Sequence, residues 1–175
     1  MDIKSLIRTI PDYPKPGIMF RDITTLLSDA KGARQAVIEL AAPFRDQQVE
    51  KVAGVEARGF IFGLAVAIEL GVGFIPVRKP GKLPFDVVGE DYELEYGTDR
   101  VEIHSDATGP GERVLLVDDL IATGGTAEAA AKVIQKVGGK IIACAFVVEL
   151  PELGGRKRLE SVGHRVVSLC EFEGE

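Results

Sequence analysis

The segment Val114–Thr126 contains the residues best suited to bind a ligand. An apolar run ends in two adjacent carboxylates, Asp118 and Asp119, and an alanine-rich stretch begins directly after the segment. Glycine lets the backbone approach a phosphate, threonine adds hydroxyl donors, and a helix N-terminus supplies free N–H groups and a favourable dipole. The sequence therefore predicts a phosphate site made by Ala122, Thr123, Gly124, Gly125 and Thr126.

The acidic pair narrows the kind of ligand. Carboxylates repel phosphate, but they suit sugar hydroxyls, a Mg²⁺ shell or a developing cation, so Asp118 and Asp119 together with the loop indicate a phosphorylated sugar. An isolated Asp-Asp pair would more often cap a helix or loop. Other phosphate motifs fail: no Gly-x₄-Gly-Lys-Ser/Thr run is present, and Gly71-Val72-Gly73 lacks its third glycine because Pro76 stands there.

Short apolar runs alternate with helical patterns along the chain, which is typical of an α/β fold with a mostly parallel sheet of about five strands flanked by helices. The clearest helix has apolar residues at Ala127, Ala130, Ala131, Ile134 and Val137, and it stops at Gly138-Gly139. Further helices are expected over residues 33–44 and 59–70. Strands are expected over residues 51–56, 73–78, 114–119, 140–149 and 165–170.

Two segments depart from this alternation. Residues 11–17 are rich in proline and should run extended rather than helical. Residues 82–104 contain two strand-like pieces around Gly97-Thr98-Asp99, which predicts a hairpin that leaves the core and serves as a flexible lid or binding loop. A plain surface hairpin is the alternative.

Composition excludes several classes of function. The 175 residues carry a net charge of −6, which argues against non-specific binding of nucleic acid. No apolar run approaches the roughly 20 residues that cross a membrane, and the N-terminus does not resemble a secretory signal, so we expect a cytoplasmic protein. Cys144 and Cys170 lie in apolar runs and are expected to be reduced, and the isolated His104 and His164 do not resemble a zinc site.

The segment Val114–Thr126 resembles the phosphoribosyl pyrophosphate (PRPP) signature of the type I phosphoribosyltransferase family. Other segments resemble motifs of the adenine-specific members, in the same order along nearly the whole chain; they are residues 16–23, 56–60, 78–84 and 94–97. The resemblance implies one domain over residues 1–175. Within it, residues 1–32 would form an N-terminal hood and residues 82–104 a flexible catalytic loop.

The resemblance also implies roles for the polar residues. Residues 122–126 would hold the 5′-phosphate, while Asp118 and Asp119 would face the ribose hydroxyls, support an oxocarbenium-like transition state and lie near the Mg²⁺ carried by PRPP. The cations Arg58, Lys79 and Lys82 would receive pyrophosphate, as a leaving group of high negative charge requires. Arg78 would reach the site of a neighbouring subunit, which implies a homodimer.

Adenine would lie between Phe20 and Leu150, with backbone groups of Met19 and Arg21 reading its edge. Glu95 would handle the proton that the base loses, and Tyr96 would help to cover the site. The family often has a cis peptide bond in the segment Glu56-Ala57-Arg58, so one is expected there. The implied reaction joins adenine to the sugar of PRPP and gives AMP and pyrophosphate, a step of purine salvage.

Two rival functions remain at this point. A xanthine or hypoxanthine phosphoribosyltransferase shares the PRPP signature but not the hood segment Phe20-Arg21-Asp22-Ile23. A non-enzymatic regulator with the same fold would sense nucleotides or bind RNA. The acidic balance and the Glu95-Tyr96 loop disfavour the regulator.

Overall fold

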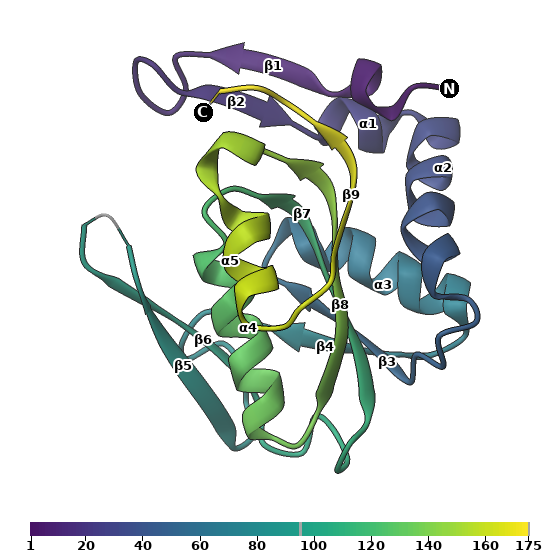
Figure 1. Cartoon of the computed structure of the whole chain (residues 1–175), viewed down its shortest axis with the longest axis vertical. Coiled ribbons are helices and arrows are strands. Elements are labelled where there is room, and N and C mark those ends of the chain that lie inside the picture. Colours follow the sequence, from purple (N-terminus) through teal and green to yellow (C-terminus); the bar gives the residue numbers. More distant parts are fainter. Residues whose placement is uncertain (95, 175) are drawn as a thin grey trace.

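A five-stranded parallel sheet forms the centre of the computed structural model, which describes residues 1–94 and 96–174 (Figure 1). The strand order is β4-β3-β7-β8-β9, and each neighbouring pair is parallel. The expectation of a mostly parallel sheet of about five strands is therefore confirmed. The strands are β3 (Lys51–Val55), β4 (Gly73–Val77), β7 (Arg113–Ile121), β8 (Lys140–Glu149) and β9 (Val166–Glu171).

Helices cover both faces of this sheet. Along β7, Leu115 and Val117 pack into one buried cluster with residues of α2 (Ala30–Ala41) and α3 (Arg58–Leu70). The alternate residues Val114 and Leu116 pack into a second cluster with α4 (Gly125–Lys136). This alternation follows from the two-residue period of a strand, and burial on both faces explains why the strands are apolar throughout.

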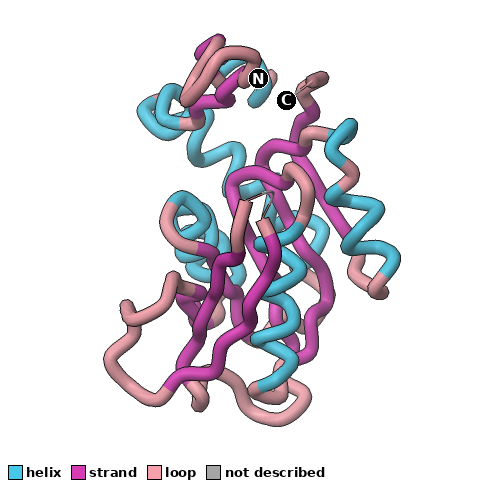
Figure 2. Tube along the Cα trace, turned by 90° about the vertical axis from the view of Figure 1, so that its left-hand side faces the viewer, coloured by secondary structure: helices cyan, strands magenta, loops and turns pink. Residues whose placement is uncertain are grey.

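The predicted hairpin consists of β5 (Val87–Glu93) and β6 (Thr98–His104) and lies against the outer side of α4 (Figure 2). Val101 and Ile103 of β6 are buried in the α4 cluster. Glu102 ties the hairpin to the segment after β4, because its backbone exchanges hydrogen bonds of 2.8 and 2.9 Å with that of Arg78. Its carboxylate accepts a 3.0 Å hydrogen bond from the Gly81 amide, which lowers the pKa of Glu102.

The N-terminal residues form a separate layer above the carboxyl end of the sheet (Figure 1). It contains the short 3-10 helix η1 (Ile3–Leu6), the antiparallel strands β1 (Arg8–Pro11) and β2 (Met19–Asp22), and α1 (Thr24–Ser28). Residues 11–17 are not helical, as predicted, but only Pro11 is extended, at the end of β1, and residues 12–17 form the connecting loop of a hairpin. Arg8 donates to Asp22 across the two strands, which lowers the pKa of Asp22 to about 2.

The C-terminal segment joins this N-terminal layer to the core. After α5 (Gly155–Ser161) and β9, the Phe172 amide donates to the Glu149 carbonyl at 3.0 Å. Lys4 and Arg21 lie 4.9 and 4.5 Å from the centre of the Phe172 ring, and the Arg21 guanidinium donates to the Glu173 carbonyl. The remaining 3-10 helices are η2 (Ala42–Phe44) and η3 (Pro151–Leu153).

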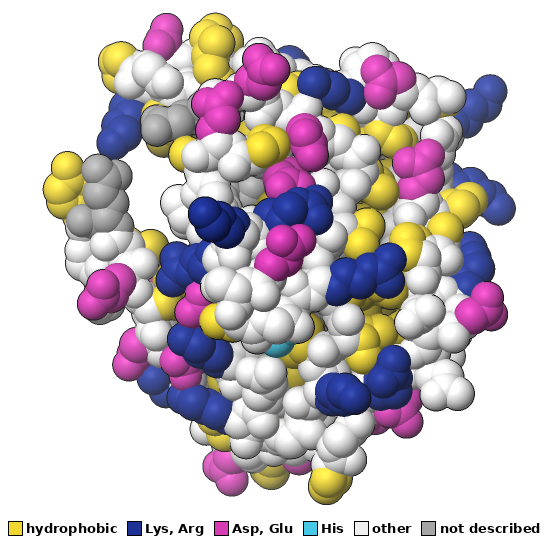
Figure 3. Space-filling model, in the orientation of Figure 1, with side chains coloured by type: hydrophobic (Ala, Val, Ile, Leu, Met, Phe, Trp, Pro, Cys, Tyr) yellow, Lys and Arg dark blue, Asp and Glu magenta, His cyan; other side chains and the backbone are white. Residues whose placement is uncertain are grey.

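Acidic and basic side chains are interspersed over the face drawn in Figure 3, rather than gathered by sign. Within the described residues, no helix has the length and apolar character needed to span a membrane. Cys144 and Cys170 are both free, as predicted, and burial raises the pKa of the Cys144 thiol to about 12.

Candidate active site

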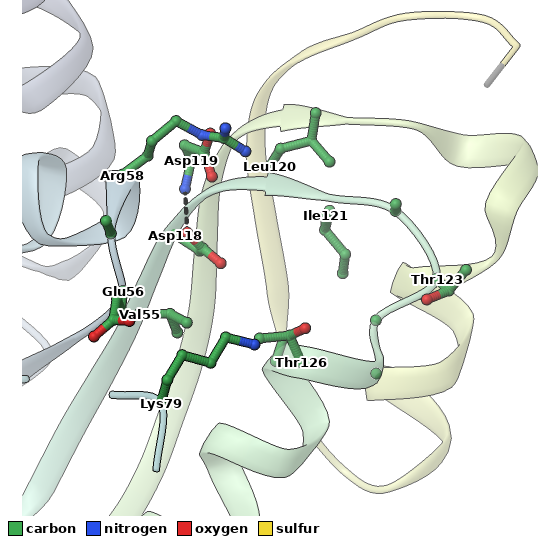
Figure 4. Close-up of a pocket in the computed structure, with 15 residues that line it drawn as sticks. Val55, Glu56, Arg58, Lys79, Asp118, Asp119, Leu120, Ile121, Thr123 and Thr126 are labelled. Atoms are coloured by element: carbon green, nitrogen blue, oxygen red, sulfur yellow. Dashed lines mark hydrogen bonds and ion pairs between the residues drawn. The ribbon is translucent and has the colours of Figure 1, made fainter. Parts of the chain in front are cut away.

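A pocket of about 400 Å³ opens where β3 and β7 end (Figure 4). This is the carboxyl edge of a parallel sheet, where α/β folds bind their ligands. Nine of the residues predicted from the sequence line it, namely Arg58, Lys79, Asp118, Asp119, Ala122, Thr123, Gly124, Gly125 and Thr126. The other lining residues are Val55, Glu56, Ala57, Leu120, Ile121 and Ala127.

The loop between β7 and α4 has the geometry of an anion site. Gly124 adopts a φ of 85°, a left-handed conformation that favours glycine, and a Cβ there would lie 3.0 Å from the backbone of Gly155. The Gly155 amide donates to the Ala122 carbonyl at 3.0 Å, which fixes the loop against α5. Among the described residues no side chain caps α4, so its first N–H groups are available to a ligand.

A second helix N-terminus faces the same pocket. Ala57 and Arg58, at the start of α3, line the pocket, and no side chain in the described part of the chain caps this helix either. The Glu56–Ala57 peptide bond is cis, as expected from the family resemblance. The pocket thus has two places where backbone N–H groups can meet an anion.

The acidic pair lies between these two helix ends. The Arg58 Nε donates to Asp119 Oδ2 at 2.5 Å, and the Asp119 amide donates to Asp118 Oδ1 at 2.8 Å (Figure 4). Burial of its carboxyl, and then the nearby Asp119 charge, raise the pKa of Asp118 well above the usual range of an aspartate. Gly59 packs closely here, since a Cβ at this position would lie 2.7 Å from Asp118 Oδ1.

Carboxylates hold two further cations of the predicted set, Lys79, expected at pyrophosphate, and Arg78, expected to reach a neighbouring subunit. Lys79 forms an ion pair with Asp99, and Arg78 Nε donates to Glu56 Oε1 at 2.7 Å. Arg78 and Lys82 do not line the pocket. The Arg78 guanidinium lies 5.9 Å from the ring centre of Phe60, and exposed Lys82 contributes its carbonyl as a 3.4 Å acceptor for Arg78.

The four residues predicted to hold adenine lie outside the lining of this pocket. Phe20 is next to its rim, since the Arg58 guanidinium is 5.6 Å from its ring centre, and the Leu150 amide donates to Ile121 at the end of β7. Met19 is exposed, and the Arg21 side chain points to Thr9 and Glu173. Their contact with a base stays a prediction.

Tyr96 and Glu95 are the remaining residues of the predicted catalytic site. Tyr96 follows β5 and is 83% exposed, outside the pocket lining, and Glu95 lies outside the described residues. Their roles also stay predictions.

Two polar residues behind the pocket lining were not predicted from the sequence, Tyr92 of β5 and Asp99 of β6. The Tyr92 hydroxyl lies 3.3 Å from both Lys79 Nζ and Thr126 Oγ1, and it donates to Asp99 Oδ2 at 3.1 Å. No motif marks either residue in the sequence. Their position depends on how the hairpin packs against α4, and the local pattern does not report that packing.

Comparison with known proteins agrees with this geometry. Residues 24–169 match the family model described as phosphoribosyl transferase domain. The adenine phosphoribosyltransferase of Methylobacillus flagellatus is 67% identical over 173 residues, covering 99% of this chain and 98% of that protein. That of Parvibaculum lavamentivorans is 66% identical over 174 residues and covers 99% of both.

Two solved structures have the same fold. The adenine phosphoribosyltransferase of Thermoanaerobacter pseudethanolicus aligns with a TM-score of 0.93 at 50% identity, over 97% of this chain and 98% of that one. The Saccharomyces cerevisiae enzyme, solved with an imino-altritol bisphosphate and adenine, aligns with a TM-score of 0.89 at 36% identity, over 96% of each chain. The fold, the pocket and these relatives agree that the chain belongs to the adenine phosphoribosyltransferases, within the phosphoribosyl transferase family.

Proposed function

We propose that this pocket transfers the phosphoribosyl group of PRPP to adenine and releases AMP and pyrophosphate. A base nitrogen forms a bond to the sugar C1 while the bond to pyrophosphate breaks, pyrophosphate leaves with the electron pair, and the base loses a proton. The observation that carries the proposal is the pair of helix N-termini on one pocket, at Gly125 and Arg58, because PRPP is anionic at both ends.

Different residues would bind the two anionic ends of PRPP. Residues 122–126 would bind the 5′-phosphate through backbone N–H groups and threonine hydroxyls, and Arg58 and Lys79 would bind pyrophosphate, with Arg78 and Lys82 joining from outside the lining. Asp118 and Asp119 would face the ribose hydroxyls and the positive charge that develops on the sugar.

We propose that Mg²⁺ enters with PRPP. Among the described residues, no group of three or more His, Cys, Asp or Glu side chains could hold a metal ion by itself. Two adjacent carboxylates, Asp118 and Asp119, nevertheless suit Mg²⁺, which usually keeps its waters and binds one or two carboxylates together with substrate phosphates. Bound there, it would offset the charge of the pyrophosphate group.

The base would lie between Phe20 and Leu150, with backbone groups of Met19 and Arg21 reading its edge. Support comes from the position of Phe20 beside the Arg58 rim and from the yeast relative, which was solved with adenine. We expect adenine to be preferred over hypoxanthine by about tenfold or more, because a carbonyl in place of the amino group leaves buried partners unpaired. Purified protein, PRPP and Mg²⁺ should be tested with adenine, guanine, hypoxanthine and xanthine, and equal turnover of adenine and hypoxanthine would contradict the assignment.

Glu95 is proposed to accept or relay the proton of the base, with Tyr96 covering the site. Glu95→Gln keeps the shape of the side chain but removes its basicity, so kcat should fall at least about tenfold while PRPP binding changes little. The matched control is Glu93→Gln at an exposed position of β5, which should keep the wild-type kcat. Wild-type kcat in Glu95→Gln, where chemistry limits turnover, would rule out the proton-transfer role.

A homodimer is proposed, with the outer face of α3 as its interface. Ile61, Leu64 and Ile68 recur at helical spacing and are 50%, 49% and 70% exposed, and Arg78 packs over Phe60 of the same helix. A second copy is the natural occupant, because closed symmetric pairs are the commonest oligomers and this face adjoins the cations of the site.

Ile68→Asp should convert the dimer to a monomer, because it would bury a carboxylate at the interface. Light scattering measures the mass in solution. The control is Val162→Asp, which makes the same kind of change at an exposed valine just after α5 and should stay dimeric. A wild-type protein that is monomeric and fully active would contradict the proposal.

We also propose that residues 1–175 act as one domain, with residues 1–32 as the hood and residues 82–104 as the flexible catalytic loop. A cytoplasmic location is part of the same proposal. The two free cysteines support it, since thiols stay reduced there.

A further inference from the structure

The hairpin supplies a carboxylate to one of the pocket's cations. Asp99 of β6 pairs with Lys79, whose ammonium group extends along the pocket wall toward Thr126 (Figure 4). The Tyr92 hydroxyl joins the same group, within 3.3 Å of Lys79 Nζ and of Thr126 Oγ1. The pair stabilises both charges, so the pKa of Asp99 is lowered and that of Lys79 is raised.

Asp99 can release Lys79 without losing all of its hydrogen bonds. Its Oδ1 accepts a 2.8 Å hydrogen bond from the Arg100 amide, and its Oδ2 accepts one of 3.1 Å from the Tyr92 hydroxyl. Both donors come from the hairpin itself. The carboxylate therefore stays fixed when the flexible lysine turns toward another anion.

Asp99 also differs from the other carboxylates that hold the site's cations. Asp119 pairs with Arg58 and belongs to the acidic pair at the sugar, and Glu56, paired with Arg78, lines the pocket. Asp99 lies outside the pocket lining, and of the described residues that hydrogen-bond to its side chain, Lys79, Tyr92 and the Arg100 amide, Lys79 alone belongs to that lining. Its charge is thus available to compete for the lysine without contacting the sugar.

We propose that Asp99 is an internal competitor of pyrophosphate for Lys79, and so weakens the site's hold on the pyrophosphate group of donor and product. This inference rests on the proposed function. Pyrophosphate carries a high negative charge and would bind several cations at once. A fixed carboxylate that already pairs with one of these cations lowers the free energy gained when pyrophosphate binds. Asp99 is in this sense a positioning residue that favours release.

The test is Asp99→Asn. Asparagine keeps an oxygen for the Arg100 amide and has nearly the same shape, but it no longer neutralises Lys79. The dissociation constant of magnesium pyrophosphate, measured by calorimetry, should fall about two- to fivefold, the range expected for a partly exposed ion pair. The KM for PRPP should fall in parallel.

The matched control is Asp91→Asn on β5. Asp91 pairs with Arg100 instead of Lys79, so the substitution makes the same change in net charge on the same hairpin. It should leave the pyrophosphate affinity within twofold of wild type, and circular dichroism should show both variants folded. An unchanged or weakened affinity in Asp99→Asn, or an equal gain in Asp91→Asn, would overturn the inference.

The outcome separates this inference from the proposed function. Calorimetry of pyrophosphate needs no turnover, so it tests Asp99 even if no base is converted. A wild-type protein that binds magnesium pyrophosphate but turns over none of the four bases would contradict the proposed function alone. A wild-type protein that does not bind magnesium pyrophosphate would contradict both.

Discussion

Asp119→Asn should lower kcat/KM for PRPP about 100- to 1000-fold, the usual cost of losing a fixed charge that stabilises a transition state. The carboxylate faces the space between the two helix N-termini, where the sugar would become positively charged. The substitution also removes the charge that now pairs with Arg58, whose Nε donates to Asp119 Oδ2 at 2.5 Å. Because the Asp119 charge helps to raise the pKa of Asp118, that pKa should fall in the variant.

Steady-state kinetics with adenine and PRPP measure this effect, and a pH–rate profile reports the change in titration. Asp106→Asn is the control. It removes one carboxylate from the exposed loop that precedes β7, at the amino end of that strand and thus away from the pocket. A kcat/KM within fivefold of wild type in Asp119→Asn would show that the charge does not act on the transition state.

Gly59→Ala should lower kcat/KM by about 100-fold and also destabilise the fold by about 1–3 kcal/mol. The new methyl group would lie 2.7 Å from Asp118 Oδ1, closer than real contacts allow, and a tight 3.2 Å from the Val117 carbonyl oxygen. Either Asp118 or the start of α3 must move, and both line the site. Misplacement of a reacting group by about 1 Å is enough for a loss of this size.

Steady-state kinetics measure the loss of kcat/KM, and thermal unfolding measures the loss of stability. Gly73→Ala is the control, because its added methyl group would have only an ordinary 3.9 Å contact with the Lys51 side chain. Gly73→Ala should leave kcat/KM and the free energy of unfolding near their wild-type values. Wild-type activity in Gly59→Ala would mean that the tight packing against Asp118 does not position it.

The sheet and the phosphate loop could be predicted because their signals are local. Five apolar runs specified the buried strands, and the junction of β7, the small-residue loop and α4 is continuous in sequence. The strand predicted over residues 114–119 in fact continues to Ile121, because its pairing with β8 extends to Glu149. Sequence alone does not report how far a partner strand reaches.

Short elements and long-range contacts could not be predicted in this way. Helix α5 has seven residues and a single large buried side chain, Leu159. Its apolar residues therefore do not recur at the spacing that would predict a helix. The strands β1 and β2 have four residues each and, within the described part of the chain, pair with no other strand. The contact between Lys79 and Asp99 spans 20 residues and requires the hairpin to return along α4.

The contacts of Phe172 link the segment after β9 to the strand that carries the proposed base site. Lys4 and Arg21 lie over its ring, and Arg21 also binds the Glu173 carbonyl, so the carboxyl end is tied to the strand that carries Phe20. Phe172→Ala would remove the ring that Lys4 and Arg21 contact and would loosen the strand that carries Phe20. If the base binds at Phe20 as proposed, loss of these contacts would weaken binding of the base before binding of PRPP, whose proposed site lies at the ends of β3 and β7.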